Sequence, residues 1–462
     1  MGLPLLGNIF DMPKPGTIEA LHWSKRKQRY GPISSVTVMG KTMIIVNDAK
    51  VAFDLLDKRS INYSSRPRQV FAGEMLGWVA SLGVQPYDDR FRSTRKVIKR
   101  EIGSKSAASR YDKAHEIEVA HFLLRLAGDP KDLTQCIKKS TGSLAPRTLY
   151  GYVAEPVKED PLIDLVERAM DTFTQATAPG AFLVDTIPLL KYLPQWMPGS
   201  GFKKLARKWR PVVQEMNSKP YAFVRSQLAK GFTNHSYAAR LIQAGEPSME
   251  ISSINEWSAS ALFGGAGDTI IGSLLCFFLA MGTYPEVQRR AQAEIDRVVE
   301  QDRLPTMSDK PNLPYMEAVI LETLRWHPIS PIPLAHECEK DDVYGGYPIP
   351  KGALIMANVW QMTHEPDVYS DPMAFRPERY MPVEDRPAET DPSKVMFGFG
   401  RRACPGRVLG ENALFFYIAQ TLATFNIKVP ENVVAAVGNG EGQETLRFTR
   451  EQFADQNLLT AQ

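Results

Sequence analysis

Cysteine is scarce in this sequence of 462 residues, and its few positions show no pairing pattern. The cysteines are Cys136, Cys276, Cys338 and Cys404, and none of them forms a Cys-x-x-Cys pair. Secreted disulfide frameworks and cysteine-rich zinc sites need closely spaced cysteines, so both are excluded and a reducing compartment is expected. The histidines likewise form no His-Glu-x-x-His or His-x-Asp pattern, which leaves zinc hydrolases and facial-triad iron centres without support.

Neither sign of charge is in excess, and no long apolar run opens the sequence. The chain has 55 lysine and arginine residues against 52 aspartate and glutamate residues, a formal net charge of +3. A nucleic-acid partner, which would favour a strongly basic chain, is therefore not expected. The segment Met1–Phe10 has too short an apolar run for a membrane span, which needs about 20 residues, and lacks the charged leader of a signal peptide.

Repeats and low-complexity segments are also missing, and what remains is typical of one large helical domain. Hydrophobic residues make up 44% of the chain, enough to bury an extensive core. Two β-rich runs, 33–38 and 42–46, flank the turn 39–41 and predict an antiparallel hairpin. Helical periodicity predicts helices at 49–57, 91–103, 111–127, 161–174, 202–230, 254–281 and 285–301. The expected class is mainly α with minor β, in a single domain spanning 1–462, with an opening segment and N-terminal sheet at 1–48 and a helix-rich body at 49–462.

Residues 252–281 predict one helix about 45 Å long, at about 1.5 Å per residue, that is apolar on nearly every face. Such a helix is expected to be buried, because a surface helix shows a polar stripe. A membrane span is the alternative interpretation. Ser252, Asn255, Glu256 and the central Asp268 argue against it, because an ionisable group in mid-bilayer is costly.

Cys404 stands in a distinctive context, the stretch Phe397-Gly-Phe-Gly-Arg-Arg-Ala-Cys-Pro-Gly406, which a helical run at 407–425 follows. Just before a helix, unpaired backbone N–H groups and the helix dipole stabilise a thiolate that could bind a metal. The glycines of the stretch allow backbone to approach a flat group closely. Without this context a lone cysteine is usually a small buried hydrophobe. The overlapping Gly398-x-Gly400-x-x-Ala403 also fits a dinucleotide-binding fingerprint, but no acidic residue follows between Asn412 and Pro430, so that interpretation is set aside.

The same stretch resembles the cysteine-ligand loop of the cytochrome P-450 superfamily, in the pattern Phe397-x-x-Gly400-x-Arg402-x-Cys404-x-Gly406. The resemblance implies the family fold, with a long central helix over a haem and small antiparallel sheets. It also implies haem b with Cys404 as the axial thiolate ligand and Phe397 and Gly398 beside the cofactor. The resemblance fades after Val429, where the polar stretch 449–456 stands in place of the family's apolar hairpin, so no substrate contact is assigned to the last thirty residues.

Further family landmarks follow in the expected order. Glu322-Thr-Leu-Arg325 resembles the Glu-x-x-Arg motif, with both side chains on one helical face, and Arg379 in Pro377-Glu-Arg379 is expected to join them. An ordinary surface pair is the alternative for the first two residues. A buried network of the three would serve to fix the ligand loop, because burial of charges costs desolvation energy and adds little stability.

Gly265-Ala-Gly-Asp268-Thr269 resembles the oxygen-activation motif of the family's long helix, which makes Asp268 and Thr269 the expected catalytic residues. Ala266 and Ile270 depart from the pattern, where glycine and a second hydroxyl are common. A threonine hydroxyl that bonds back to a carbonyl beside glycines can open a helix for dioxygen and water. A kink with only a packing role is the alternative.

Three basic side chains are expected on the haem propionates. Phe91-Arg-Ser-Thr-Arg95 resembles the family's Trp-x-x-x-Arg helix, with Phe91 in place of the tryptophan, and Arg95 offers a charged fork to a carboxylate. By the same resemblance His336 and Arg402 are expected to serve the propionates too.

The resemblance implies a haem-thiolate monooxygenase that activates O2 with electrons from NADPH, delivered by a separate NADPH-cytochrome P-450 reductase. The opening segment is most similar to fungal microsomal members. That similarity implies secondary metabolism or detoxification, and a location on the cytosolic face of the endoplasmic reticulum membrane through an N-terminal anchor upstream of this sequence. A basic docking patch for the reductase is expected from Lys96, Lys99, Arg100, Arg401 and Arg407.

The predicted substrate is a small lipophilic organic molecule. The residues expected to line the distal side are apolar, although they could equally be plain core: Met75, Leu76, Trp78, Leu262 and Phe263. Two other functions stay open. One is a haem-thiolate peroxygenase or isomerase that needs no reductase, and the other is a haem-binding protein without catalysis.

Overall fold

The computed structural model describes residues 6–14, 16–128, 132–155, 160–300, 302–383, 387–428 and 459–461. The chain divides into two compact units that alternate along the sequence. The first unit comprises 1–64, 115–141 and 268–462, and the second comprises 65–114 and 142–267. The stretch 449–456, from which no substrate contact is expected, lies outside the described residues.

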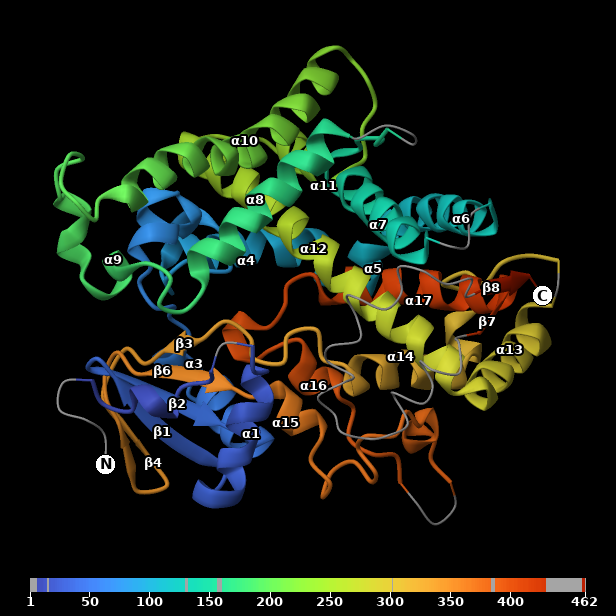
Figure 1. Ribbon diagram of the computed structural model, residues 1–462. Helices are drawn as coiled ribbons and strands as arrows, with labels where there is room; N and C mark the ends of the chain where they lie inside the picture. Colours follow the sequence, from blue (N-terminus) through green and yellow to red (C-terminus); the bar gives the residue numbers. More distant parts are fainter. Residues whose placement is uncertain are drawn as a thin grey trace. The chain divides into compact units, whose positions relative to one another are not determined.

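A four-stranded sheet of order β1-β2-β6-β3 organises the amino-terminal part of the first unit (Figure 1). Strands β1 (Ile33–Val38) and β2 (Lys41–Val46) form the predicted antiparallel hairpin. Its turn residues Met39 and Gly40 have φ values of 50° and 79°, the left-handed pair that a tight two-residue hairpin requires. Strand β6 (Leu354–Ala357) pairs with β2 in parallel and with β3 (His336–Glu337) in antiparallel, so this sheet is mixed.

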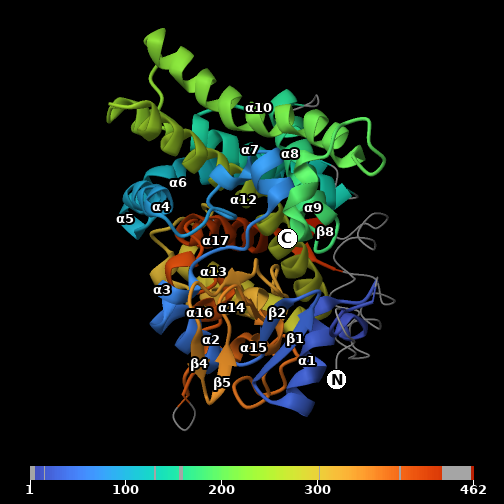
Figure 2. The same ribbon diagram turned by 90° about the vertical axis from the view of Figure 1, so that its left-hand side faces the viewer.

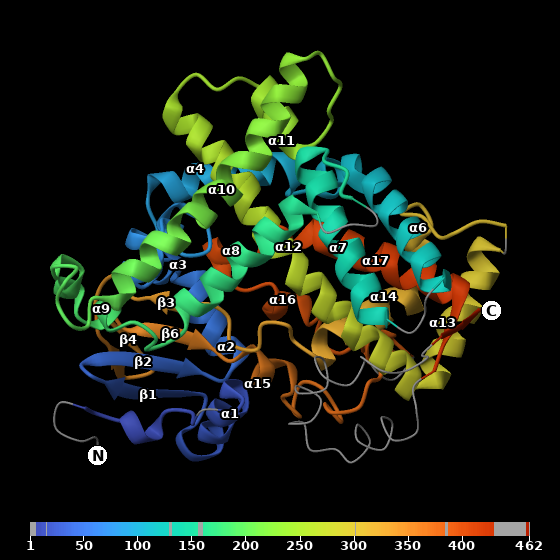
Figure 3. The ribbon, with the colours of Figure 1, turned by 45° about the horizontal axis from the view of Figure 1, so that its top comes forward.

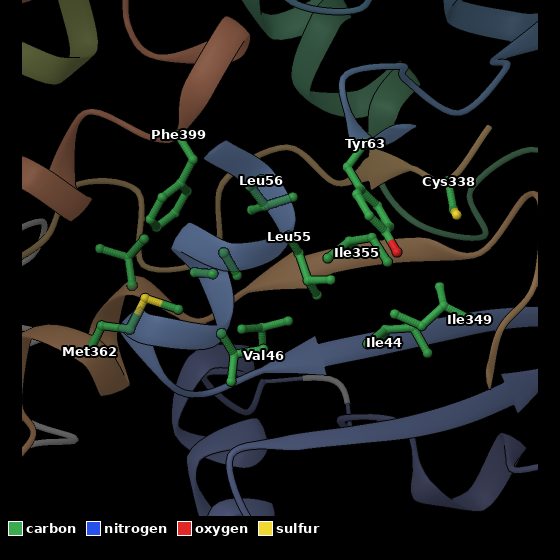
Figure 4. Close-up of a cluster of buried hydrophobic side chains, with 14 of the residues drawn as sticks. Ile44, Val46, Leu55, Leu56, Tyr63, Cys338, Ile349, Ile355, Met362 and Phe399 are labelled. Carbon is green, nitrogen blue, oxygen red and sulfur yellow. The ribbon is translucent and has the colours of Figure 1, made fainter. Parts of the chain in front are cut away.

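Alternation along β2 sends neighbouring side chains to opposite faces of this sheet. On one face Ile45 packs with Trp23 of α1 (Glu19–Tyr30). On the other face Ile44 and Val46 join a buried cluster with Ile355, into which Phe399 also reaches (Figure 4). The hairpin β4 (Asp342–Tyr344) with β5 (Tyr347–Ile349) and the pair β7 (Phe425–Ile427) with β8 (Leu459–Ala461) complete the described strands.

In the first unit the long carboxy-terminal helix α17 (Arg407–Thr424) packs with α13 (Pro285–Val299) and α14 (Pro314–Trp326) (Figure 2). Further helical segments of this unit are α2 (Ala49–Ala52), the π-helical turn η2 (Phe53–Lys58), α3 (Ser60–Tyr63), α15 (Val359–Thr363) and α16 (Ser393–Met396), besides short 3-10 turns. The helix predicted at 49–57 is therefore an α turn that continues as a π turn.

The second unit is helical in its described part, and α10 (Gly201–Ala229) lies along α8 (Pro161–Thr177) (Figure 3). Its other helices are α4 (Asp89–Ile102), α5 (Lys105–Ala108), α9 (Leu183–Thr186) and α11 (Tyr237–Gln243), with a π turn η3 (Val70–Met75). Side chains of Asp88 and Asp160 cap α4 and α8 by accepting backbone N–H bonds, which fixes where each helix begins.

Three helices contribute residues to both units: α6 (Asp112–Gly128), α7 (Leu133–Tyr150) and α12 (Met249–Thr283). The sequence predicted α6 and α12 but not α7, whose periodicity Gly142 and Pro146 obscure. Within the described part of the chain, α12 is the one helix whose length and apolarity would suffice to cross a membrane. Half of its most apolar stretch is buried in the protein, whereas residues 264–272 are intermediate or exposed, so the expected burial holds for only part of this helix.

Candidate active site

The loop before α17 carries an exposed thiol. Cys404 is exposed, whereas the other three cysteines are buried. The Cys404 backbone N–H donates to the Phe397 carbonyl over 2.6 Å and closes the loop, and α17 begins three residues later at Arg407. The predicted position of the cysteine, just ahead of a helix N-terminus, is therefore confirmed.

Gly400 allows this loop to pass directly over the chain at Leu56. Its φ is +51°, and a Cβ atom there would lie 2.2 Å from the Leu56 carbonyl oxygen. Both the conformation and the contact exclude a side chain, so glycine is required at this position. Phe399 anchors the same loop to the core, because its side chain is buried and meets Phe53 edge to face with 5.5 Å between ring centroids.

Phe397 is covered on one side by a cation. The Arg407 guanidinium carbon lies 5.2 Å from the Phe397 ring centroid. Arg407 also donates to Glu411 over 2.7 Å and to the Ser393 hydroxyl over 2.8 Å. These contacts fix the residues on either side of the cysteine loop. Arg407 was also assigned to the predicted docking patch for the reductase, and that patch stays a prediction.

Two of the three residues expected on the propionates bond to adjacent carbonyls of the chain. His336 Nδ1 lies 2.7 Å from the Tyr63 carbonyl oxygen, and Arg402 Nε donates to the Ser64 carbonyl oxygen over 2.6 Å. Since a carbonyl can only accept, Nδ1 is the ring nitrogen of His336 that carries hydrogen toward Tyr63. The first unit thus holds His336 and Arg402 against one short stretch of backbone.

Arg95 lies on α4 in the second unit and is partly buried. Phe91, one turn earlier on the same helix, is buried, and its backbone N–H bonds to the Asp88 cap over 2.8 Å. The expected role of Arg95 on a propionate stays a prediction.

Glu322, Arg325 and Arg379 form the predicted network, and all three side chains are completely buried. Arg325 donates from Nε and Nη2 to the two carboxylate oxygens of Glu322 over 2.7 and 2.8 Å, and Arg379 Nε donates to Glu322 Oε1 over 3.1 Å. The surface-pair alternative is wrong. Burial would lower the pKa of Arg325, but the Glu322 hydrogen bonds outweigh it and raise that pKa, so the guanidinium stays charged.

The sequence missed two members of this network. The Tyr380 hydroxyl donates to Glu322 Oε2 over 3.2 Å, and Arg379 Nη1 donates to Glu389 over 2.6 Å. Burial would raise the pKa of Glu389, but hydrogen bonds from Ser370 and Arg379 lower it below its usual range. Neither residue lies at a helical spacing from Glu322, so no local pattern could have found them.

The network holds the chain between α15 and α16 through its carbonyl groups. Arg325 donates to the carbonyls of Thr363, Pro372 and Ala374. Arg379 donates to the carbonyl of Ser370 over 2.9 Å. This segment leads into α16 and from there to the cysteine loop. The contacts agree with the predicted role of fixing that loop.

Asp268 and Thr269 are exposed in the middle of a helix that is buried further along. The Thr269 carbonyl accepts a hydrogen bond from the Ser273 hydroxyl over 3.0 Å, and α12 remains helical through this turn. A Cβ atom added at Gly267 would meet nothing within 4 Å, whereas one at Gly272 would lie 2.8 Å from the Ile329 side chain. A side chain at Gly272 would therefore require Ile329 to shift, whereas Gly267 borders open space.

The apolar residues expected to line the distal side are largely packed within the second unit. Leu76, Trp78 and Phe263 are buried. Trp78 meets Phe173 edge to face with 5.1 Å between centroids, and Phe263 meets Tyr150 with 5.5 Å. These contacts agree with the plain-core interpretation, and a role in lining the substrate site stays a prediction.

The donor set of this site fits a haem. No group of three or more histidine, cysteine or acidic residues in the described part of the chain could hold a metal ion. An iron bound by Cys404 would therefore have to bring its remaining ligands with it, as a porphyrin does. His336 and Arg402 supply cationic or hydrogen-bonding groups in the same unit as Cys404, of the kind that propionates need.

Comparisons with known proteins agree on one family. The family model described as cytochrome P-450 matches residues 1–440. The cytochrome P-450 monooxygenase claR of Ampulloclitocybe clavipes is 45% identical over 92% of this chain and 79% of its own, and ppsD of Aspergillus oryzae is 43% identical over 92% and 81%. The O-methylsterigmatocystin oxidoreductase of Aspergillus flavus is 38% identical over 92% and 80%. A zebra fish cytochrome P-450 structure with progesterone has a TM-score of 0.73 at 23% identity, covers 90% of this chain and 94% of its own, and shows the fold alone.

Proposed function

This chain belongs to the cytochrome P-450 family and is an oxidoreductase of the haem-thiolate monooxygenase class, and we propose that it oxidises a small lipophilic product of fungal secondary metabolism. Three of the relatives are fungal enzymes, which supports the metabolic setting. One relative is named as an O-methylsterigmatocystin oxidoreductase, which supports a small organic molecule as the substrate. We place 1–462 in one family domain, because the family model runs across both units.

The observation that carries this proposal is the position of Cys404, in a loop that its own backbone N–H closes directly before α17. A haem held by this thiolate supplies the activation of dioxygen. The residues of the chain would bind and orient that cofactor: Cys404 would supply the sulfur ligand, and Arg95, His336 and Arg402 would bind the propionates. Phe397 and Gly398 flank the ligand. Glu322, Arg325 and Arg379 keep the preceding segment in place.

Asp268 and Thr269 are the proposed proton-handling pair. Both are exposed on α12 beside Gly267, where the helix has open space, so water can reach their oxygen atoms. In this position the carboxylate and the hydroxyl could accept protons from water and hold them in the site. We propose NADPH as the electron source, through a separate reductase, because the three fungal relatives belong to the same class.

We also propose contact with the cytosolic face of the endoplasmic reticulum membrane. Four large apolar side chains are strongly exposed within 183–196, namely Leu183, Leu189, Tyr192 and Trp196, and Trp196 is 80% exposed. Exposed patches of this kind mark interaction sites, and aromatic rings favour the membrane interface.

The decisive experiment is the absorbance spectrum of the reduced protein under carbon monoxide. We expect a strongly red-shifted Soret band that Cys404→Ser abolishes and that the matched control Cys136→Ser retains, because Cys136 is buried on α7 and is not part of the loop. A red-shifted band in Cys404→Ser would contradict the ligand assignment. Turnover with NADPH and reductase supports the monooxygenase, whereas turnover with peroxide alone favours the reductase-independent alternative. Haem binding without product from either source favours the non-catalytic one.

A further inference from the structure

Helix α12 changes character one turn after the proposed proton-handling pair. Residues 264–272 are partly or fully exposed, whereas every residue of 273–281 is buried. Asp268 and Thr269 lie in the open part, and Ser273 is the first residue of the buried part. All three belong to the first unit. The Ser273 side chain therefore starts from the buried part of the helix, directly beside the turn that carries the pair.

The turn that leads to Asp268 and Thr269 has few side chains that could hold it in shape. It contains Gly265, Ala266 and Gly267 in succession. A Cβ atom added at Gly265 or Gly267 would meet nothing within 4 Å. Glycine also has a low helix propensity, because it loses the most backbone freedom on folding. This turn thus depends on its hydrogen bonds more than on side-chain packing.

The buried part of α12 is held by α14 and the residues that follow it. A Cβ atom at Gly272 would lie 2.8 Å from Ile329 Cδ1, so Ile329 fits closely against this glycine. One turn further along, the Cys276 thiol donates to the Thr323 carbonyl over 3.7 Å. Thr323 follows Glu322 on α14, the helix that carries the buried ion-pair network. From Gly272 onward α12 therefore has fixed neighbours within the first unit.

A side-chain hydrogen bond joins the two parts of the helix. The Ser273 hydroxyl donates to the Thr269 carbonyl over 3.0 Å, and Ser273 is only 5% exposed. In an α-helix the same carbonyl also accepts the backbone N–H four residues later, so Ser273 offers it two donors. A hydroxyl that bonds one turn back in this way can bend a helix, and it restrains the carbonyl that it holds.

The position of this hydroxyl distinguishes it from similar bonds elsewhere in the chain. Thr141, for example, donates to the Ile137 carbonyl over 2.9 Å, but both of these residues are buried on α7. Ser273 instead connects a buried part of α12 to an open one. It is the next hydroxyl residue after Thr269, because Ile270, Ile271 and Gly272 have none, and at i+4 it lies on the same face of the helix.

We propose that Ser273 is a positioning residue for the oxidation, and that its hydroxyl fixes the Thr269 carbonyl and thereby the direction of the Thr269 side chain. This inference rests on the proposed role of Asp268 and Thr269. Ser273 is buried and its hydroxyl is engaged, so it acts through Thr269 rather than on the substrate. Without this bond the open turn of α12 moves more freely, and the Thr269 hydroxyl points in a wider range of directions.

The first test is infrared spectroscopy of the reduced, haem-loaded full chain under carbon monoxide, which needs neither the substrate nor the reductase. The C–O stretching frequency depends on the electric field of nearby dipoles, so it reports on a hydroxyl beside the bound gas. We expect Thr269→Val to shift this band and Ser273→Ala to shift it too. In the Thr269→Val background Ser273→Ala should add no further shift, because the two residues act as a unit. Ser273→Thr retains a hydroxyl and should restore the parent band.

The second test is amide hydrogen exchange of α12, followed by mass spectrometry of its peptides. In Ser273→Ala the peptides that cover 264–272 should exchange about twofold to tenfold faster, the range expected for the loss of one ordinary hydrogen bond. Peptides that cover 274–281 should exchange as in the parent protein, since the contacts of the buried part with α14 remain. The red-shifted carbon monoxide band of each variant verifies that it is folded.

The matched control is Ser258→Ala, at a buried serine on the same helix. Ser258 donates to the Asn255 carbonyl over 2.7 Å and accepts from the Tyr237 hydroxyl over 2.9 Å, and it is completely buried. This variant loses two hydrogen bonds, so it tests whether a general weakening of α12 is enough to move the C–O band. We expect its band to match that of the parent protein.

Faster exchange at 264–272 together with a band shift that Ser273→Thr reverses supports the positioning role. A parent-like band or unchanged exchange in Ser273→Ala, an equal shift in Ser258→Ala, or additive shifts in the double variant would each overturn it. If Thr269→Val leaves the band unchanged, the proposed role of Thr269 fails and the role of Ser273 fails with it. If Thr269→Val shifts the band and Ser273→Ala does not, only the role of Ser273 fails.

Discussion

Neutralising the buried carboxylate of Glu322 should destabilise the protein far more than neutralising an exposed carboxylate that pairs with an arginine at the same i, i+3 spacing. Glu322 accepts five hydrogen bonds, from Arg325 Nε and Nη2, Arg379 Nε, the Arg376 backbone N–H and the Tyr380 hydroxyl. In Glu322→Gln only one oxygen accepts, so at most the three donors at Oε1 keep their partner. The new amide NH2 group would then face the Arg325 Nε–H group, donor against donor.

The expected loss of unfolding free energy is about 3–5 kcal/mol, because two fully buried guanidinium groups lose the charge between them. The matched control is Glu286→Gln on α13. Glu286 pairs with Arg289, also three residues later, but its side chain is 78% exposed. We expect this control to lose less than about 1 kcal/mol.

The assay is urea unfolding of both variants and the parent, followed by far-ultraviolet circular dichroism. The free-energy differences come from the midpoint shifts at a common slope. A loss for Glu322→Gln no larger than that of Glu286→Gln would refute the argument that burial makes this network matter.

Two further changes test the cysteine loop and the pH dependence. Gly400→Ala should destabilise the protein by more than about 2 kcal/mol, because its Cβ atom would overlap the Leu56 carbonyl at a positive φ. The control is Gly410→Ala on α17, whose Cβ atom would meet no atom within 4 Å. In the same urea assay this control should be neutral or stabilising by up to about 1 kcal/mol. Burial lowers the pKa of His327 to about 4, so below pH 6.5 the unfolded chain takes up a proton that the folded protein does not. Unfolding free energy should therefore fall by about 2 kcal/mol more between pH 7 and pH 5 in the parent than in His327→Asn, and equal slopes would show that this imidazole is not buried in the neutral form.

Local patterns in the sequence predicted the parts of the fold that depend on neighbouring residues. The alternation of β2 and its glycine turn predicted the hairpin, and a long segment that is apolar on nearly every face predicted α12. The partners of β2 were not predictable, because β6 and β3 are too short to show a period and their pairing depends on residues distant in the chain. Strand β3, which carries His336, is only two residues long.

The site followed the same division. The i, i+3 spacing of Glu322 and Arg325 was enough to predict that they pair. The position of Cys404 before a helix was likewise visible in the sequence. Tyr380 and Glu389 could not be found, since they reach the network from a segment without periodicity. Apolar composition alone likewise could not separate a substrate wall from plain core at Trp78, because both need the same side chains.

The pairing of β2 with β6 also constrains how the chain can fold during synthesis. Asn358, at the end of β6, donates to Asn47, which precedes it by 311 residues. At about 5–20 residues per second, roughly 15–60 s separate the appearance of these partners from the ribosome. During that interval the edge of β2 that later pairs with β6 has no partner strand. An unpaired strand edge is a template for association with other chains. Slow translation or heavy expression should therefore favour aggregation through the amino-terminal hairpin, and a chaperone that covers Met43–Val46 would raise the yield of folded protein.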